Sequence, residues 1–257
     1  MTRPVVLVTG AARRLGRAIA LHLAAHGWDI ALHYRGSVDE AEATAAEGRA
    51  AGARVVPLQA DLADETQCRA LLPAALAALG RVDAVVNSAA LFEHDETASF
   101  SYAALDRHLH ANTAPAIVLA QALHDQLPAG RQGAVVNLLD QKLFNPNPDH
   151  LSYTLSKAAL QMAGTVLAQA LAPRVRVNAV APGLTLGSDM IDAQRLAELQ
   201  ATTPLHRGVR PEDVAAAVRL LLESPSITGS TLLVDAGSHL APTARDFAFQ
   251  PQAPAQT

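Results

Sequence analysis

Short runs of β-branched and aliphatic residues alternate along the chain with longer alanine-rich stretches, whose apolar residues recur every three or four positions. The short runs predict strands, and the longer stretches predict amphipathic helices. We expect strands at Pro4–Val8, Asp29–His33, Arg54–Gln59, Val82–Asn87, Gly133–Leu138, Arg174–Val180 and Thr231–Val234. We expect helices at Arg14–His26, Asp39–Ala51, Glu65–Leu79, Tyr102–Gln126, Ser152–Ala172, Ala193–Thr202 and Pro211–Leu222.

This alternation is typical of a parallel sheet with helices on both faces. The pattern therefore predicts a Rossmann-like, doubly wound α/β fold with three layers and seven parallel strands. No linker or internal repeat interrupts the pattern, so residues 1–240 are expected to form a single domain. From Ala241 onward Pro, Ala and Gln dominate, and we expect residues 241–257 to be a loosely packed tail. Closure of this tail over a neighbouring part of the protein is the alternative.

The composition narrows the functional classes. The chain has 257 residues, of which 50% are hydrophobic and 17% charged, with a formal net charge of −4. Arginines and acids are mixed along it, so a nucleic-acid partner is not expected. No apolar run approaches the roughly 20 residues that span a bilayer, so no membrane partner is expected either. Cys68 is the only cysteine, which suits a reducing compartment, and we expect a cytoplasmic protein.

The turn after the first strand is a candidate phosphate-binding site. It runs from Thr9 to Gly16 and leads directly into the first helix. Such a turn directs backbone N–H groups and the positive end of a helix toward one point, where a pyrophosphate fits. Gly10 permits the tight turn, and Gly16 permits close approach of the helix to the sheet. An ordinary connection between a strand and a helix is the alternative reading of this segment.

The end of the second strand indicates which dinucleotide is bound. Enzymes that select NAD place an acidic residue there for the ribose hydroxyls, and this chain has none. It offers instead His33, Tyr34, Arg35 and Ser37, with Arg13 from the first turn. Arginine forms charge-assisted hydrogen bonds to phosphate oxygens. These side chains favour the 2′-phosphate of NADPH, unless the arginines are only solvated surface charges.

Further polar residues follow later strands and should meet at the carboxyl edge of the sheet, where open α/β sheets bind ligands. Asp140 follows the fifth strand, and a helix bearing Tyr153 and Lys157 comes next. Residues four apart share a helix face. The Lys157 ammonium is therefore expected to lower the pKa of the Tyr153 phenol and make it a usable acid.

Taken together, these motifs resemble the classical short-chain dehydrogenase/reductase family from Val5 to about Gly237. The motifs are the turn from Thr9 to Gly16, Asp61 and Leu62, Asn87 to Ala89, Asn112, Tyr153 with Lys157, Pro182 with Gly183, and Val234 with Asp235. The resemblance implies that Tyr153 is the acid, that Lys157 lowers the tyrosine pKa and binds the nicotinamide ribose, and that Asn112 holds a proton-relay water. It implies a cofactor site made of Gly10, Arg13, Arg14, Leu15, His33, Tyr34, Arg35, Ser37, Asp61, Leu62, Ser88, Ala89, Tyr153, Lys157, Pro182, Gly183 and Thr185.

Three positions depart from the family pattern. Arg14 replaces the middle glycine of the turn and Ser88 replaces a second asparagine, and both changes are expected to alter cofactor contacts. The third departure is Asp140, which replaces the usual catalytic serine. Together with the run from Arg13 to Gly16, the His33–Tyr34 pair and Phe92, it resembles the pteridine reductase branch. In that branch the resemblance implies that Arg14, Phe92, Asp140 and Tyr153 bind the substrate, Phe92 by stacking on the pterin. Where members of the branch carry a serine close to this phenylalanine, the chain has Ala90. We expect Asp140 to carry or exchange a proton, because two ionised groups side by side are electrostatically costly.

The resulting hypothesis is an NADPH-dependent reductase of a dihydropterin or dihydrofolate, and the resemblance further implies a homotetramer. Residues 184–210 are expected to include the substrate loop. A carbonyl reductase of the same family is one alternative, and a non-catalytic NADPH-binding sensor or scaffold is another. No metal site is expected, because the ten histidines show no ligand spacing.

Overall fold

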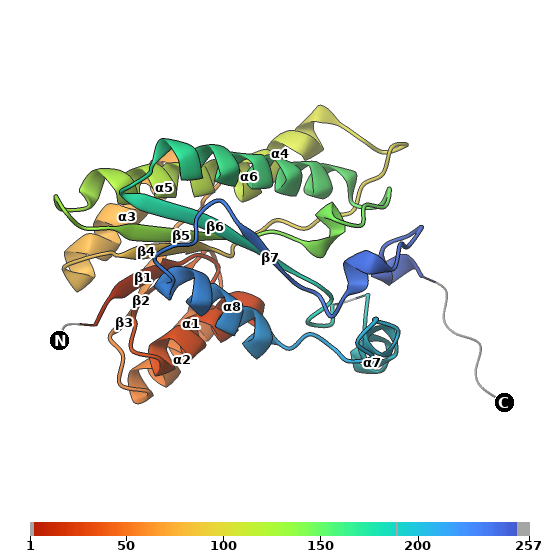
Figure 1. Cartoon of the computed structure of the whole chain (residues 1–257), viewed down its shortest axis with the longest axis horizontal. Coiled ribbons are helices and arrows are strands. Elements are labelled where there is room, and N and C mark those ends of the chain that lie inside the picture. The colour runs from red at the N-terminus through yellow and green to blue at the C-terminus, as the bar shows by residue number, and fades with distance from the viewer. Residues whose placement is uncertain (1–2, 189, 251–257) are drawn as a thin grey trace.

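A parallel sheet of seven strands forms the centre of the computed structural model, which describes residues 3–188 and 190–250 (Figure 1). In spatial order the strands are β3 (Val55–Gln59), β2 (Asp29–Tyr34), β1 (Val5–Val8), β4 (Ala84–Asn87), β5 (Gly133–Leu138), β6 (Val175–Pro182) and β7 (Thr231–Val234). The chain first builds outward from β1 to β3, then returns and builds the other way from β4. This reversal confirms the doubly wound Rossmann-like fold and creates a crevice between β1 and β4, where such sheets bind ligands.

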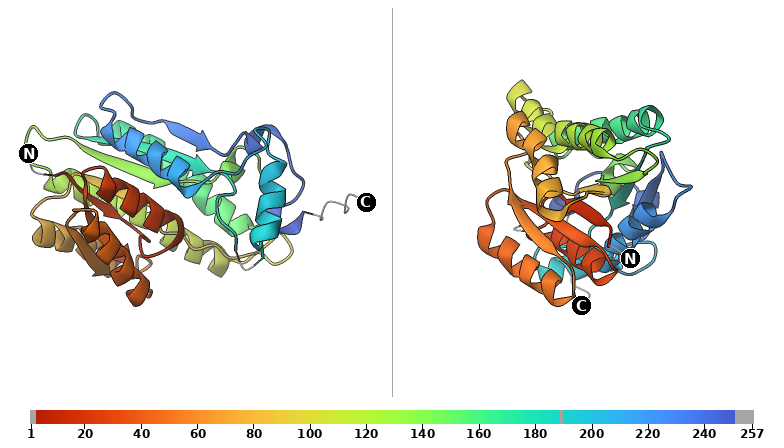
Figure 2. Two further views of the ribbon diagram at one scale, coloured as in Figure 1. Left: turned by 90° about the horizontal axis from the view of Figure 1, so that it is seen from below. Right: turned by 90° about the vertical axis from the view of Figure 1, so that its left-hand side faces the viewer.

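Helices cover both faces of the sheet and give three layers (Figures 1 and 2). One face carries α1 (Arg14–Ala25), α2 (Val38–Ala50) and α8 (Pro211–Glu223), and the other carries α3 (Glu65–Leu79), α5 (Ala114–Gln126) and α6 (Leu151–Ala170). The strands β1, β4 and β5 are buried along their whole length, as hydrophobic runs between two helical layers should be. Helix α7 (Ala193–Ala201) lies at the carboxyl end of the sheet. Within the described ranges no helix combines the length and apolarity that a bilayer crossing requires.

The single helix expected over Tyr102–Gln126 is wrong. The structure has two helices, α4 (Tyr102–Asn112) and α5, separated at Thr113. Pro115 lacks the N–H group that a continuous helix needs, whereas a proline is accepted in the first turn of a new helix, where it lies in α5. The Thr113 hydroxyl donates instead to the Ser156 carbonyl at 2.8 Å, which ties the break to α6. The break leaves Asn112 at the end of α4.

The expectation of a loose tail is wrong for residues 241–250. Arg245 forms an ion pair with Asp149 at 2.8 Å, and Asp246 forms one with Lys142 at 3.0 Å. A short helix, η3 (Phe247–Phe249), follows them, and two others are η1 (Gln141–Leu143) and η2 (Ser238–Leu240). The remaining tail residues, 251–257, lie outside the described residues. Thus part of a segment without hydrophobic periodicity is held by charges on distant parts of the chain. The boundary drawn at residue 240 stays a prediction.

Candidate active site

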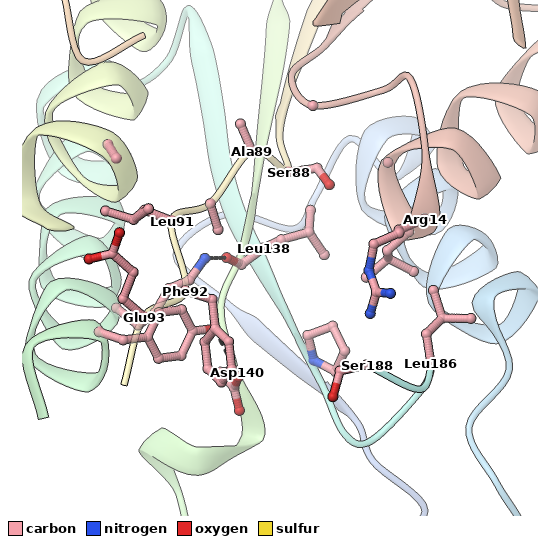
Figure 3. A pocket seen from close by; sticks show the side chains of 18 of the residues that line it. Arg14, Ser88, Ala89, Leu91, Phe92, Glu93, Leu138, Asp140, Leu186 and Ser188 are labelled. Carbon is pink, nitrogen blue, oxygen red and sulfur yellow. Dashed lines mark hydrogen bonds between the residues drawn. The ribbon is translucent and has the colours of Figure 1, made fainter. Parts of the chain in front are cut away.

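A pocket of about 1060 Å³ opens at the carboxyl edge of the sheet, beside the crevice between β1 and β4. Arg14, Leu186 and Ser188 lie on one side of it, and Phe92 and Asp140 on the other (Figure 3). Of the residues that the sequence predicts for the site, Asn112 is not in the pocket wall. The wall includes Gly10, Arg13, Arg14, Leu15, His33, Tyr34, Arg35, Ser37, Asp61, Leu62, Ser88, Ala89, Phe92, Asp140, Tyr153, Lys157, Pro182, Gly183 and Thr185.

The turn between β1 and α1 is tight, and it depends on two glycines. A Cβ atom on Gly16 would lie 2.2 Å from the Gly10 carbonyl oxygen, so only glycine lets the helix approach the turn this closely. Gly10 has φ +64°, in the left-handed region that favours glycine. Arg14 has φ 55° at the position of the missing family glycine, and its guanidinium donates to the Gly187 carbonyl at 2.8 Å. The N-terminus of α1 therefore faces the pocket beside an arginine.

The edge of the pocket near β2 carries positive charge. Arg13 and Arg35 are exposed there, next to Tyr34 and Ser37, and β2 ends without an acid. His33, predicted to bind the cofactor, takes a different role. Its Nδ1 accepts from the Gly10 N–H at 3.1 Å, so its Nε2 carries the proton and donates to the Ala60 carbonyl at 3.1 Å. Because both ring nitrogens are engaged and the ring is buried, His33 supports the turn and leaves no donor for a phosphate.

Three of the four predicted catalytic residues, Asp140, Tyr153 and Lys157, meet in the pocket wall. The Tyr153 hydroxyl donates to the Asp140 carboxylate at 2.9 Å, and the other oxygen of Asp140 accepts from the Lys142 N–H at 2.9 Å. Lys157 lies one helical turn after Tyr153 on α6, with Nζ 5.7 Å from the centre of the tyrosine ring. Its ammonium donates to the Leu138 carbonyl at 2.7 Å. Strand β5 and helix α6 thus bring a carboxyl, a phenol and an ammonium together.

Burial dominates the electrostatics of these three groups. It raises the pKa of Asp140 above its ordinary value, against hydrogen bonds from Lys142 and Tyr153. Burial and the neighbouring Asp140 carboxylate raise the pKa of the Tyr153 phenol well above its ordinary value. Burial lowers the pKa of Lys157 to about 8.

The expectation that Lys157 lowers the tyrosine pKa is therefore wrong for this arrangement. The Tyr153 hydroxyl is engaged with the carboxyl, while the ammonium lies at the side of the ring and bonds to the backbone. The phenol consequently keeps its proton and shares it with Asp140, whose raised pKa favours the protonated acid. The pair can pass a proton from one oxygen to the other.

Asn112 does not present its side chain to the pocket. The amide oxygen accepts from the Leu91 N–H at 2.6 Å, and the amide nitrogen donates to the Leu91 carbonyl and the Ser156 hydroxyl at 3.0 and 2.9 Å. Both amide hydrogens are used within the protein, so these contacts give no support to the predicted water-holding role of the side chain. They fix the segment after β4 against α6 instead, and this segment carries Phe92.

Phe92 presents an aromatic face to the pocket. Its side chain is 55% exposed, which is unusual for a phenylalanine, and its ring meets the Tyr153 ring edge-on with centres 4.7 Å apart. It also stacks on the His150 ring, with centres 4.2 Å apart. An exposed aromatic ring beside a proton donor is a suitable platform for a flat heterocycle.

Comparisons with known proteins agree with this geometry. A family model described as enoyl-(acyl carrier protein) reductase matches residues 10–239. The chain is 33% identical over 240 residues to the 3-oxoacyl-(acyl-carrier-protein) reductase FabG of Staphylococcus aureus. The matched region covers 91% of this chain and 97% of that reductase. The chain belongs to the short-chain dehydrogenase/reductase family. It is an oxidoreductase of this family, which uses NAD(P)H.

Two solved structures of the family are similar over nearly the whole chain. The FolM alternative dihydrofolate reductase 1 of Brucella canis, complexed with NADP, has a TM-score of 0.87 and 40% identity, covering 93% of this chain and 95% of that one. The corresponding protein of Brucella suis, in complex with NADP, has a TM-score of 0.86 and 40% identity, covering 93% of this chain and 96% of that one.

Part of the predicted substrate loop lines the pocket. Leu184, Thr185, Leu186 and Ser188 line the wall, and Ser188 pairs with Ile191 in a short antiparallel bridge. Asp189, which the sequence places in the same loop, lies outside the described residues. Across residues 3–188 and 190–250, no group of three or more His, Cys, Asp or Glu side chains is arranged to hold a metal ion.

Sequence reasoning missed several residues of the wall. His150 supports Phe92, and Gln141, Lys142, Asp246 and Phe247 line the pocket near Asp140. Gln141 and Lys142 directly follow Asp140 in the sequence, and this position could have indicated that they belong to the site. No motif or spacing marked His150, Asp246 or Phe247, because they reach the pocket only through the tertiary fold.

Proposed function

We propose that the protein reduces a C=N bond of a pterin, such as a dihydropterin or dihydrofolate, with NADPH as the hydride donor. The observation that carries this proposal is the hydrogen bond from Tyr153 to Asp140 beside the exposed face of Phe92. The 40% identity to the FolM alternative dihydrofolate reductases, which were crystallised with NADP, supports it.

The residues around the turn fit NADPH. The N-terminus of α1 borders the pocket through Arg13 to Gly16, where its N–H groups would hold a pyrophosphate, and Arg13 and Arg35 would supply positive charge for a 2′-phosphate. When bound, NADPH supplies the hydride. Lys157 lies deep enough in the pocket to bind the ribose next to the nicotinamide, and Arg14 is placed to contact phosphate or substrate.

The protein's own part in the reaction is to hold the heterocycle and deliver a proton. Reduction of C=N adds a hydride to carbon and requires one proton on nitrogen. Phe92 stacks the ring, and the Tyr153 hydroxyl delivers its proton to the ring nitrogen. Because its pKa is raised, Asp140 can hold a proton and pass it through their hydrogen bond to Tyr153, which has lost its own. Solvent then restores the proton of Asp140.

Substrate turnover tests the proposal directly. NADPH oxidation is measured with dihydrobiopterin and dihydrofolate, against a panel of ketones and an acetoacetyl thioester, and NADH is compared with NADPH. We expect pterin-dependent oxidation of NADPH, with NADH much less effective because it lacks the 2′-phosphate. Turnover of ketones or thioesters alone would show that Asp140 merely replaces serine in a carbonyl reductase. That second candidate is favoured by the 33% identity to the 3-oxoacyl reductase FabG.

Activity is expected to fall as pH rises through about 8, where Lys157 loses its proton. Burial depresses the pKa of Lys157, so the ammonium is fully present only below that value and disappears above it. The raised pKa of Asp140 acts in the same direction, because its proton is also lost as pH rises. The check is the pH profile of kcat/KM with pterin. A profile that stays flat well above pH 8 would contradict an essential ammonium.

The homotetramer implied by the sequence resemblance stays a prediction. It is supported by apolar side chains exposed on helices α5 and α6. Ile117, Leu155, Met162 and Val166 are between 40% and 64% exposed on these helices. Burying them between subunits would remove apolar surface from water.

A further inference from the structure

Residues 245–249, which we name the C-terminal strap, lie against the substrate end of the pocket. Asp246, Phe247 and Ala248 belong to the pocket wall together with Asp140 and Phe92. The last coloured segment of the chain lies at the same end of the sheet as α7 in both views (Figures 1 and 2). The strap follows the last motif of the family resemblance, which ends near Gly237.

A buried carboxylate anchors the first residue of the strap. The Asp149 side chain is 2% exposed, and its two carboxylate oxygens share the N–H of Arg245 Nε at 2.9 and 3.0 Å. It also accepts from the Asp246 N–H at 2.7 Å. The hydrogen bond from Arg245 holds the pKa of Asp149 below its ordinary value, so the carboxylate stays charged. An ion pair with one buried partner and a backbone bond fixes the strap more firmly than a surface pair does.

The C-terminal strap is linked to Asp140 through Lys142. The Lys142 side chain is 3% exposed, and its ammonium donates to Asp246 at 3.0 Å and to Asn147. The backbone N–H of the same residue donates to the Asp140 carboxylate. A buried ammonium without its counter-ion is costly, so loss of Asp246 would displace Lys142. The N–H bond that orients Asp140 depends on that residue staying in place.

The strap reaches the aromatic platform through His150. The Phe249 and His150 rings have centres 5.9 Å apart with their planes inclined by 28°, and His150 in turn stacks on Phe92 with centres 4.2 Å apart. The Arg245 guanidinium lies over the Phe249 ring, 5.2 Å from its centre, and adds a cation–π contact. Phe92 is more than half exposed, so His150 is a main support of its orientation.

We propose that the C-terminal strap positions the substrate-binding and proton-delivering groups, with Phe249 acting on Phe92 through His150 and Asp246 acting on Asp140 through Lys142. Phe249 and Asp246 are positioning residues. The identity of the stacked substrate rests on the proposed function, whereas the contacts of the strap do not. We call the contacts from Phe249 through His150 to Phe92 the aromatic arm, and those from Asp246 through Lys142 to Asp140 the charged arm. The two arms have different kinetic effects, because the aromatic arm supports binding of the substrate ring and the charged arm supports delivery of the proton.

The Phe249→Ala variant tests the aromatic arm. Aromatic contacts contribute about 0.5–1.5 kcal/mol, so we expect KM for the substrate to rise about two- to tenfold, with kcat and KM for NADPH little changed. In a Phe92→Ala background the same substitution should add nothing further, because the supported ring is gone. Phe100→Ala, which removes a partly exposed phenylalanine outside the pocket wall, is the matched control. If Phe249→Ala does not fold, Phe249→Leu keeps the apolar volume and should show the same rise in KM.

The Asp246→Asn variant tests the charged arm, and we expect it to lower kcat while KM for the substrate changes little. Kinetics use whichever substrate the wild type reduces, pterin or ketone, so absence of pterin turnover in the wild type overturns only the proposed function. Amide hydrogen exchange supplies a readout without substrate: residues 141–150 should exchange faster in Phe249→Ala and Asp246→Asn than in the wild type or Phe100→Ala. Unchanged exchange there, wild-type kinetic constants, or additive effects of Phe249→Ala and Phe92→Ala would overturn the role of the strap.

Discussion

Replacing Tyr153 with phenylalanine is expected to lower kcat by about 10²–10⁴-fold, the contribution typical of a positioned general acid. The variant loses the hydroxyl that donates to Asp140 at 2.9 Å, while the ring and its edge-on contact with Phe92 remain. Affinity for NADPH should change little, because the turn after β1 is untouched. The measurements are steady-state NADPH oxidation with the pterin substrate and titration of NADPH binding.

The matched control is Tyr102→Phe, which removes the hydroxyl of a tyrosine that is 82% exposed at the start of α4. It should keep the wild-type kcat. If Tyr153→Phe also left every measurable activity unchanged, the site would not be the catalytic one, and a non-catalytic NADPH-binding sensor or scaffold would become the better explanation. Loss of NADPH binding in the phenylalanine variant would indicate a disturbed pocket rather than a lost proton donor.

The second large effect is expected for Asp140→Asn, with kcat for the pterin lowered by about 10²-fold. The asparagine oxygen can still accept from the Lys142 N–H, so the local backbone should keep its conformation. The raised pKa of Asp140 allows its carboxyl group to hold a proton, and the amide of asparagine cannot do this. Proton delivery should therefore suffer much more than NADPH affinity, which is checked by comparing kcat with the dissociation constant of NADPH.

Asp125→Asn is the control for this substitution, because its carboxylate is 66% exposed on α5 and contacts only the adjacent His124 among the ion pairs of the described chain. The variant Asp140→Ser introduces serine, the residue that the family resemblance implies at this position. It should lose pterin reduction, since a serine hydroxyl is not an acid near neutral pH. A large loss of NADPH affinity with unchanged turnover in Asp140→Asn would contradict proton delivery by this residue.

Much of the fold follows from local patterns in the sequence. Strands such as Val5–Val8 lie between two helical layers, so they read as short continuous apolar runs. The spacing of Tyr153 and Lys157 placed both on one helix face, and the order of strands placed Asp140 at the same edge of the sheet. The expectation failed at Thr113, where Pro115 ends the helical pattern that the apolar periodicity alone continues.

The rest of the site depends on contacts between distant segments. His33 looked like a phosphate ligand because of its position near the end of β2, but its ring nitrogens are occupied by Gly10 and Ala60. Lys157 looked like the group that sets the tyrosine pKa, but burial and Asp140 dominate it. The bond from Lys142 to Asp246 joins residues 104 positions apart, and neither residue belongs to a motif. Local sequence carries no signal for such pairs.

The bond from Arg14 to the Gly187 carbonyl joins two segments that are 173 positions apart. A guanidinium carries five N–H donors, and this bond uses one of them, so Arg14 can hold the Gly187 carbonyl and still direct other donors toward an anion in the pocket. Replacing Arg14 would therefore remove a tie between the first turn and the opposite wall as well as a positive charge, and the two losses would have to be separated by a lysine substitution that keeps the charge.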